Sequence, residues 1–198
     1  GTVYASAATC ALCNIMLMDC AHIQMSEAEW KSRKSVRNGG PEIEPLYDIE
    51  DARALLGRMR PCGYGTAVQV NESVSIRFTD VGHLLGSAAI EVWLTEGGET
   101  RKITFSGDLG NLDQPILKDP QPVGDTEYLV IESTYGDRLH DKGRVDYVPA
   151  LAERIQRTLD RGGNVIIPSF AVGRTQELLY FLREIKHQGL VKSFPSFQ

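Results

Sequence analysis

The chain has 198 residues, of which 42% are hydrophobic and 24% are charged, a composition typical of soluble globular proteins rather than of disordered chains. No apolar run approaches the roughly 20 residues that cross a bilayer, and the first residues carry no signal-peptide pattern, so we expect a cytoplasmic protein with no membrane partner. The net charge of -5 argues against non-specific electrostatic binding of nucleic acid, but metal ions bound in a site can still attract phosphate locally.

The first part of the chain is predicted to be mainly helical. Residues 2–6 have strand character, and residues 7 to about 34 carry apolar side chains at helical spacing. Glycines and a proline at 38–41 end this helix. Asp48 is a suitable N-cap for a second helix, which we expect to end near Met59.

From about residue 61 the hydrophobic pattern changes to a period of two, which predicts strands. Apolar side chains alternate with polar or small ones at 68–70 and 74–78. Residues 89–95 and 101–106 flank the turn sequence Glu96-Gly97-Gly98-Glu99, so they are predicted to form a hairpin.

The last part of the chain alternates between the two periods. Residues 128–132 are predicted to form a short buried strand, and residues 143–161 are predicted to form a helix. Residues 164–168 are predicted to form a further strand, followed by a helix at 173–186. This order indicates a second unit of α/β character that starts near residue 145.

Four cysteines could form disulfides or a zinc knot, since Cys10 and Cys13 have the Cys-x-x-Cys spacing. Cys10, Cys13 and Cys20 fall in the apolar helical segment, and no second Cys-x-x-Cys accompanies them. We therefore favour free cysteines that serve as small hydrophobic residues, Cys62 included.

Two candidate metal ligands lie just outside the two ends of the predicted hairpin. His83 precedes it in Gly82-His83-Leu84-Leu85-Gly86-Ser87-Ala88, and Asp108 follows it in Ser106-Gly107-Asp108-Leu109-Gly110. These positions share one edge of an antiparallel pair, so the two side chains can converge. An imidazole and a carboxylate suit a borderline cation such as zinc. The alternative is that both side chains only anchor their loops by hydrogen bonds.

Two further motifs follow in the order Glu132-Ser133-Thr134-Tyr135-Gly136-Asp137 and Pro168-Ser169-Phe170-Ala171-Val172-Gly173-Arg174-Thr175-Gln176-Glu177-Leu178-Leu179. With all four motifs, the chain resembles the β-CASP group of metallo-β-lactamase-fold nucleases, which includes bacterial RNA exonucleases and the endonuclease subunit of mRNA 3′-end cleavage. The resemblance implies an α/β fold with a partial metallo-β-lactamase αββα-type sandwich at 1–144. The first elements of an α/β β-CASP domain would occupy 145–198.

The same resemblance implies a zinc-dependent hydrolase that cleaves RNA phosphodiester bonds. Asp108 would bridge two zinc ions, His83 would bind one of them, and Glu132 would orient a histidine of a later motif that acts as a general acid. The alternative for Glu132 is a carboxylate that caps its own turn.

Ser169 and Arg174 are candidates for contacts with RNA phosphate. They lie where a predicted strand leads into a helix start, and free N–H groups at such a start favour an anion. An ion pair of Arg174 with Glu177 or Glu132 is an equally open alternative.

The family's first ligand block, His-x-His-x-Asp-His, and its later histidine motifs do not occur in the sequence, so we expect an internal fragment. Two ligands leave zinc short of the usual three protein ligands. We therefore expect weak or absent zinc binding and no activity for the isolated chain. A non-catalytic β-CASP-like RNA-binding or scaffold subunit is the alternative function. Assembly into a homo-oligomer and the choice between endonuclease and exonuclease stay open.

Overall fold

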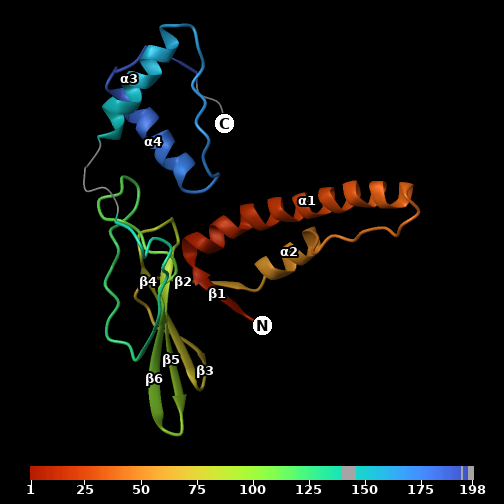
Figure 1. Ribbon diagram of the computed structural model, residues 1–198. Coiled ribbons are helices and arrows are strands. Elements are labelled where there is room, and N and C mark those ends of the chain that lie inside the picture. The colour runs from red at the N-terminus through yellow and green to blue at the C-terminus, as the bar shows by residue number, and fades with distance from the viewer. Residues whose placement is uncertain (140–145, 193, 196–198) are drawn as a thin grey trace. The chain divides into compact units, whose positions relative to one another are not determined.

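A computed structural model describes residues 1–139, 146–192 and 194–195, and the chain divides into two compact units (Figure 1). The first unit comprises Gly1–Asn111 and Asp119–Glu132, and the second comprises Leu112–Lys118 and Ser133–Gln198. Among the described residues, no helix is both long enough and apolar enough to cross a membrane.

The first unit contains two helices and seven strands. They are β1 (Val3–Ser6), α1 (Ala7–Arg37), α2 (Ile49–Leu56), β2 (Met59–Cys62), β3 (Val68–Asn71), β4 (Val74–Asp80), β5 (Ala88–Glu96), β6 (Glu99–Phe105) and β7 (Tyr128–Val130).

The strands form two sheets. β1 and β2 make a parallel pair, and β3-β4-β5-β6-β7 make a five-stranded sheet that is antiparallel except for its last pair, β6 and β7. The predicted hairpin is confirmed as β5 and β6. Gly97 and Gly98 form its turn with φ values of 60° and 86°, in the left-handed region that glycine adopts without strain.

The long helix α1 begins at a side-chain cap and packs beside α2. The Ser6 hydroxyl accepts a hydrogen bond from the Thr9 amide at the helix start. Ala21 and Ala28 of α1 and Ala52 of α2 are buried, and the two helices lie side by side in Figure 1. The helix predicted at 7–34 is thus confirmed and ends at Arg37.

The second predicted helix is confirmed, but its expected end near Met59 is wrong. Asp48 and Asp51 form a reciprocal capping box at the start of α2, which ends at Leu56. Met59 instead begins β2, because the chain there pairs with β1. Ladder hydrogen bonds between distant segments override the local helical preference of these residues.

The second unit contains two described helices, α3 (Tyr147–Leu159) and α4 (Arg174–His187). Ala152, Ile155, Ile185 and Val191 form its buried core. The predicted helices at 143–161 and 173–186 correspond to α3 and α4, although residues 143–145 lie outside the described part. The predicted domain boundary between 144 and 145 also lies there, so the assignment of 1–144 and 145–198 to two domains stays a prediction.

Two predictions about strands are wrong. Residues 164–168 form no strand, because no segment in the described part of the chain pairs with them. β7 forms as predicted but is not buried: Tyr128, Leu129 and Val130 are each more than half exposed. Among the strands of the described chain, β7 pairs only with β6 at the sheet edge. The combination of helices and sheets agrees with the α/β class, whereas the αββα-type sandwich remains a prediction.

Candidate metal site

The His83 and Asp108 side chains converge from two loops of the first unit. His83 lies between β4 and β5, and Asp108 lies three residues after β6. The His83 Nε2 and Asp108 Oδ2 atoms are 3.8 Å apart, and the side chains are 40% and 69% exposed. That separation is too long for a direct hydrogen bond. The two groups therefore face one another at a position open to solvent.

The His83 loop is held by three hydroxyl groups, one within the loop and two at the start of α1. Within the loop, the amides of His83 and Leu84 both donate to the Ser87 Oγ at 3.1 Å. The Ser6 and Thr9 hydroxyls donate to the Gly86 carbonyl oxygen at 2.8 and 3.0 Å. The start of α1 thus fixes the far end of the loop.

Tyr64 adds a contact at the same end of the loop. Its hydroxyl donates to the Ser87 carbonyl oxygen at 3.0 Å. Burial, followed by the nearby Asp80 carboxylate, raises the pKa of Tyr64. The phenol therefore keeps its proton and remains a hydrogen-bond donor.

Glycines bring the two loops into backbone contact. The Gly110 amide donates to the Val81 carbonyl oxygen at 2.8 Å. A Cβ atom at Gly110 would overlap the Gly82 carbonyl and lie 2.6 Å from the His83 nitrogen. Only a residue without a side chain permits this approach, so Gly110 sets the spacing between the two candidate ligands.

Glu132 holds the Asp108 loop from the end of β7. Its Oε1 accepts a hydrogen bond of 2.6 Å from the Leu109 amide, and its own amide donates to the Ser106 Oγ at 3.0 Å. Glu132 thus binds a loop 23 residues earlier in the chain. The alternative in which Glu132 caps its own turn did not anticipate this contact.

The positions of His83 and Asp108 fit a shared metal ion. Two ligand atoms that each lie about 2.1 Å from a tetrahedral zinc ion are about 3.4 Å apart. The observed 3.8 Å is close to that separation, and imidazole nitrogen with carboxylate oxygen is a donor set that zinc accepts. No group of three or more His, Cys, Asp or Glu residues suited to a metal ion occurs within the described ranges.

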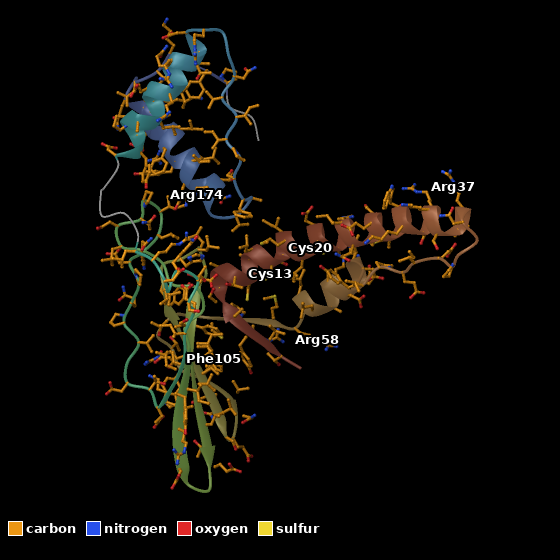
Figure 2. The ribbon with its side chains drawn as sticks, viewed as in Figure 1. Cys13, Cys20, Arg37, Arg58, Phe105 and Arg174 are labelled. Carbon is orange, nitrogen blue, oxygen red and sulfur yellow. The ribbon has the colours of Figure 1, made fainter. Side chains whose placement is uncertain are left out.

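Ser169 and Arg174 lie in the second unit and are engaged in local contacts. Arg174, labelled at the start of α4 in Figure 2, pairs with Glu177 at 2.6 Å. The Ser169 hydroxyl lies 2.9 Å from that of Thr175. The Gln176 side chain accepts a hydrogen bond from the Gly173 amide at the helix start. The ion-pair alternative for Arg174 is therefore the arrangement seen, and phosphate binding would require these contacts to rearrange.

The four cysteines are free, as expected from the sequence. Cys13 and Cys20 lie along α1 (Figure 2), and Cys62 of β2 is buried. Burial, followed by the neighbouring thiols of Cys13 and Cys62, raises the pKa of Cys10. A raised pKa reduces the thiolate fraction, so Cys10 lacks the character of a reactive thiol.

The residues that hold the loops in place were not predicted from the sequence. Ser6, Thr9 and Tyr64 were not among the candidate site residues, although a serine such as Ser6 just before an apolar helix is a signal of a helix cap. The contact of Ser6 with Gly86 joins residues 80 apart in the chain, and no local pattern signals it.

Long stretches of the chain are similar to RNA-cleaving proteins. Ribonuclease TTHA0252 of Thermus thermophilus is 36% identical over 188 residues, which cover 95% of this chain and 38% of that protein. The RNase J-like protein of Methanocaldococcus jannaschii is 33% identical over 157 residues, covering 78% of this chain and 36% of that protein. The chain belongs to the β-CASP family of metallo-β-lactamase-fold RNA nucleases. The resemblance inferred from the four motifs is thus confirmed.

A eukaryotic β-CASP relative extends the same similarity. Endoribonuclease YSH1 of Eremothecium gossypii is 33% identical over 149 residues, covering 74% of this chain and 18% of that protein. No family model matches the chain. The β-CASP chain spans well under half the length of these three relatives. Similarity over long segments assigns the family, whereas the roles of single side chains stay predictions.

Proposed function

We propose that the full-length protein that carries this chain is a zinc-dependent ribonuclease that hydrolyses RNA phosphodiester bonds. One observation carries the proposal. In a β-CASP chain, the His83 and Asp108 side chains lie 3.8 Å apart, on two loops whose backbones are in contact at Gly110. Relatives named as ribonucleases make RNA the substrate class to test.

In this proposal His83 and Asp108 would hold zinc, of which the complete site would contain two ions. When bound, zinc supplies Lewis-acid stabilisation of negative charge on phosphate oxygens and lowers the pKa of water. The residues of this chain supply position: the Ser6 and Thr9 hydroxyls hold the His83 loop, and Glu132 holds the Asp108 loop. Further ligands are required, because zinc catalysis normally uses three protein ligands.

The 198-residue chain alone is then a poor catalyst. With His83 and Asp108 as the only candidate zinc ligands that we assign in the described part of the chain, it should bind zinc weakly or not at all and leave RNA intact. Because the net charge is -5, attraction of RNA would depend on the bound metal and on local phosphate contacts, for which Ser169 and Arg174 remain candidates. A cytoplasmic location and self-association also stay predictions.

The test is RNA cleavage by the full-length protein with and without a chelator. Cleavage should require metal, and the variants His83→Ala and Asp108→Ala should each lower the rate at least about 100-fold, more than the loss typical of outer-shell changes. His22→Ala is the matched control, because His22 lies on α1, outside the loops of the site, and should leave the rate unchanged. Metal-loaded protein that binds RNA without cleaving it would contradict the proposal and favour a scaffold subunit.

A further inference from the structure

We propose that Glu132 is a positioning residue that fixes the Asp108 loop by accepting a hydrogen bond from the Leu109 amide. The importance of this contact for metal binding rests on the proposed function. It differs from the role that the family resemblance implies, in which the acid orients a histidine from a later motif. That role requires a charged partner for an imidazole, whereas the role proposed here requires only an acceptor oxygen.

The contacts enclose Asp108 on both sides. Before it, the Ser106 amide donates to the Val130 carbonyl oxygen at 2.9 Å, and the Ser106 Oγ accepts from the Glu132 amide at 3.0 Å. After it, the Leu109 amide donates to the Glu132 Oε1 at 2.6 Å. Asp108 therefore lies between two residues that are both bonded to the segment from Val130 to Glu132.

The loop needs such support because its own structure is irregular. Residues 106–111 belong to no helix or strand, Gly107 has a φ of 58°, and the Asp108 side chain is largely exposed. The Ser106 side, by contrast, is buried and continues the β6 ladder. Beyond Asp108, the Leu109 contact with Glu132 holds the residue next to the carboxylate, and the Gly110 amide bond to Val81 holds the residue after it.

Metal affinity should therefore depend on the hydrogen bond from the Leu109 amide to Glu132. A short bond to a charged acceptor is stronger than one to a neutral acceptor. Loss of groups that orient metal ligands typically lowers metal affinity by about 10- to 100-fold. Without the acceptor at position 132, the loop would be held after Asp108 only at Gly110, and the Asp108 carboxylate would sample other directions relative to His83.

Two variants at one position separate the two roles of Glu132. Glu132→Gln keeps an acceptor oxygen but removes the charge, and Glu132→Ala removes both. Glu127→Ala is the matched control: its carboxylate also accepts from a backbone amide, that of Lys102, but at a distance along the sheet edge from the Asp108 loop. Hydrogen exchange of the Leu109 amide is measured by NMR in the 198-residue chain, and zinc affinity by chelator competition in the full-length protein.

Glu132→Ala should speed exchange of the Leu109 amide at least about tenfold, since an opened loop loses its protection, and should weaken zinc binding about 10- to 100-fold. Glu132→Gln should retain most of both properties, and Glu127→Ala should change neither. Unchanged Leu109 exchange in Glu132→Ala, or equal zinc affinity in the Gln and Ala variants, would overturn the inference. A full-length protein that binds no zinc would instead overturn the proposed function, while Leu109 exchange would still decide whether Glu132 fixes the loop.

Discussion

Glu91 is a fully buried carboxylate on the middle strand of the five-stranded sheet, and its charge is satisfied by residues on the two adjacent strands. Arg77 of β4 binds both carboxylate oxygens at 2.7 Å, and Lys102 of β6 and Thr79 of β4 each lie 2.7 Å away. Arg77 and Lys102 also lie 5.3 Å from the ring centre of Trp93. Two cations and an aromatic ring thus offset the cost of burying this charge.

The Glu91 cluster should make stability depend on pH in acid. The hydrogen bond from Arg77 is the largest influence on the pKa of Glu91, which lies at about 2 rather than its ordinary 4.5. A group whose pKa is lower in the folded state stabilises the fold above its unfolded pKa. This stabilisation, on the order of 3 kcal/mol, should be lost as the pH falls from about 4.5 towards about 2.

The measurement is urea unfolding of the chain and of Glu91→Gln from pH 7 to pH 2. The wild type should be several kcal/mol more stable than the variant at pH 7, because loss of one partner of a buried ion pair costs about 3–5 kcal/mol. That difference should shrink in acid. Glu99→Gln, which breaks an exposed pair with Arg101, should cost less than about 1 kcal/mol at every pH. A pH-independent difference for Glu91→Gln would contradict this account.

Gly110 should tolerate no side chain. Gly110→Ala forces a methyl group into the Gly82 carbonyl, so the backbones must separate at a cost of about 1–3 kcal/mol. Gly124→Ala is the matched control, because the nearest atom to its Cβ would be the flexible Lys102 Nζ at 3.9 Å. Urea unfolding of both variants tests this. Equal stabilities would show that the two loops are not held together as described.

At the scale of elements, the start of α1 serves two purposes. Ser6 caps the helix by accepting from the Thr9 amide, and the Ser6 and Thr9 hydroxyls also donate to the Gly86 carbonyl oxygen of the His83 loop. A Cβ at Gly86 would lie 2.7 Å from the Thr9 nitrogen, so this contact leaves no space for a side chain. The geometry of His83 therefore depends on where α1 begins.

Thr9→Val tests this dependence by removing a hydroxyl while keeping the shape of the side chain. The lost hydrogen bond should cost about 1 kcal/mol, and hydrogen exchange of the His83 and Leu84 amides should accelerate. Thr95→Val, which removes an exposed hydroxyl contact with Thr100, is the control and should leave these amides unaffected. Unaltered exchange at His83 in Thr9→Val would argue that the helix start does not hold the loop.

Elements with strong local patterns were predictable from the sequence, and elements that depend on distant partners were not. The alternation along β4 and the Gly97-Gly98 turn sufficed for the sheet and the hairpin. The segment at 164–168 has equally apolar residues but lacks a partner in the described chain, and strand formation needs a partner. Met59 shows the opposite: it was predicted to be helical but lies in a strand, because it pairs with Val3 of β1, and no local sequence pattern indicates that pairing.

At the scale of the whole molecule, the sequence predicted which side chains converge but not what holds them. His83 and Asp108 were expected at one edge of the hairpin, and they lie 3.8 Å apart. The supporting contacts from Ser6 and Glu132 come from segments distant in the chain. Such contacts are set by tertiary packing, which hydrophobic periodicity does not encode.

The central claim is that His83 and Asp108 bind one metal ion in the full-length protein. Zinc-edge anomalous diffraction from crystals of that protein, grown with zinc, tests it most directly. We predict a peak about 2.0–2.2 Å from both the His83 Nε2 and an Asp108 carboxylate oxygen. Zinc bound elsewhere, with the two side chains making no contact to it, would contradict the account.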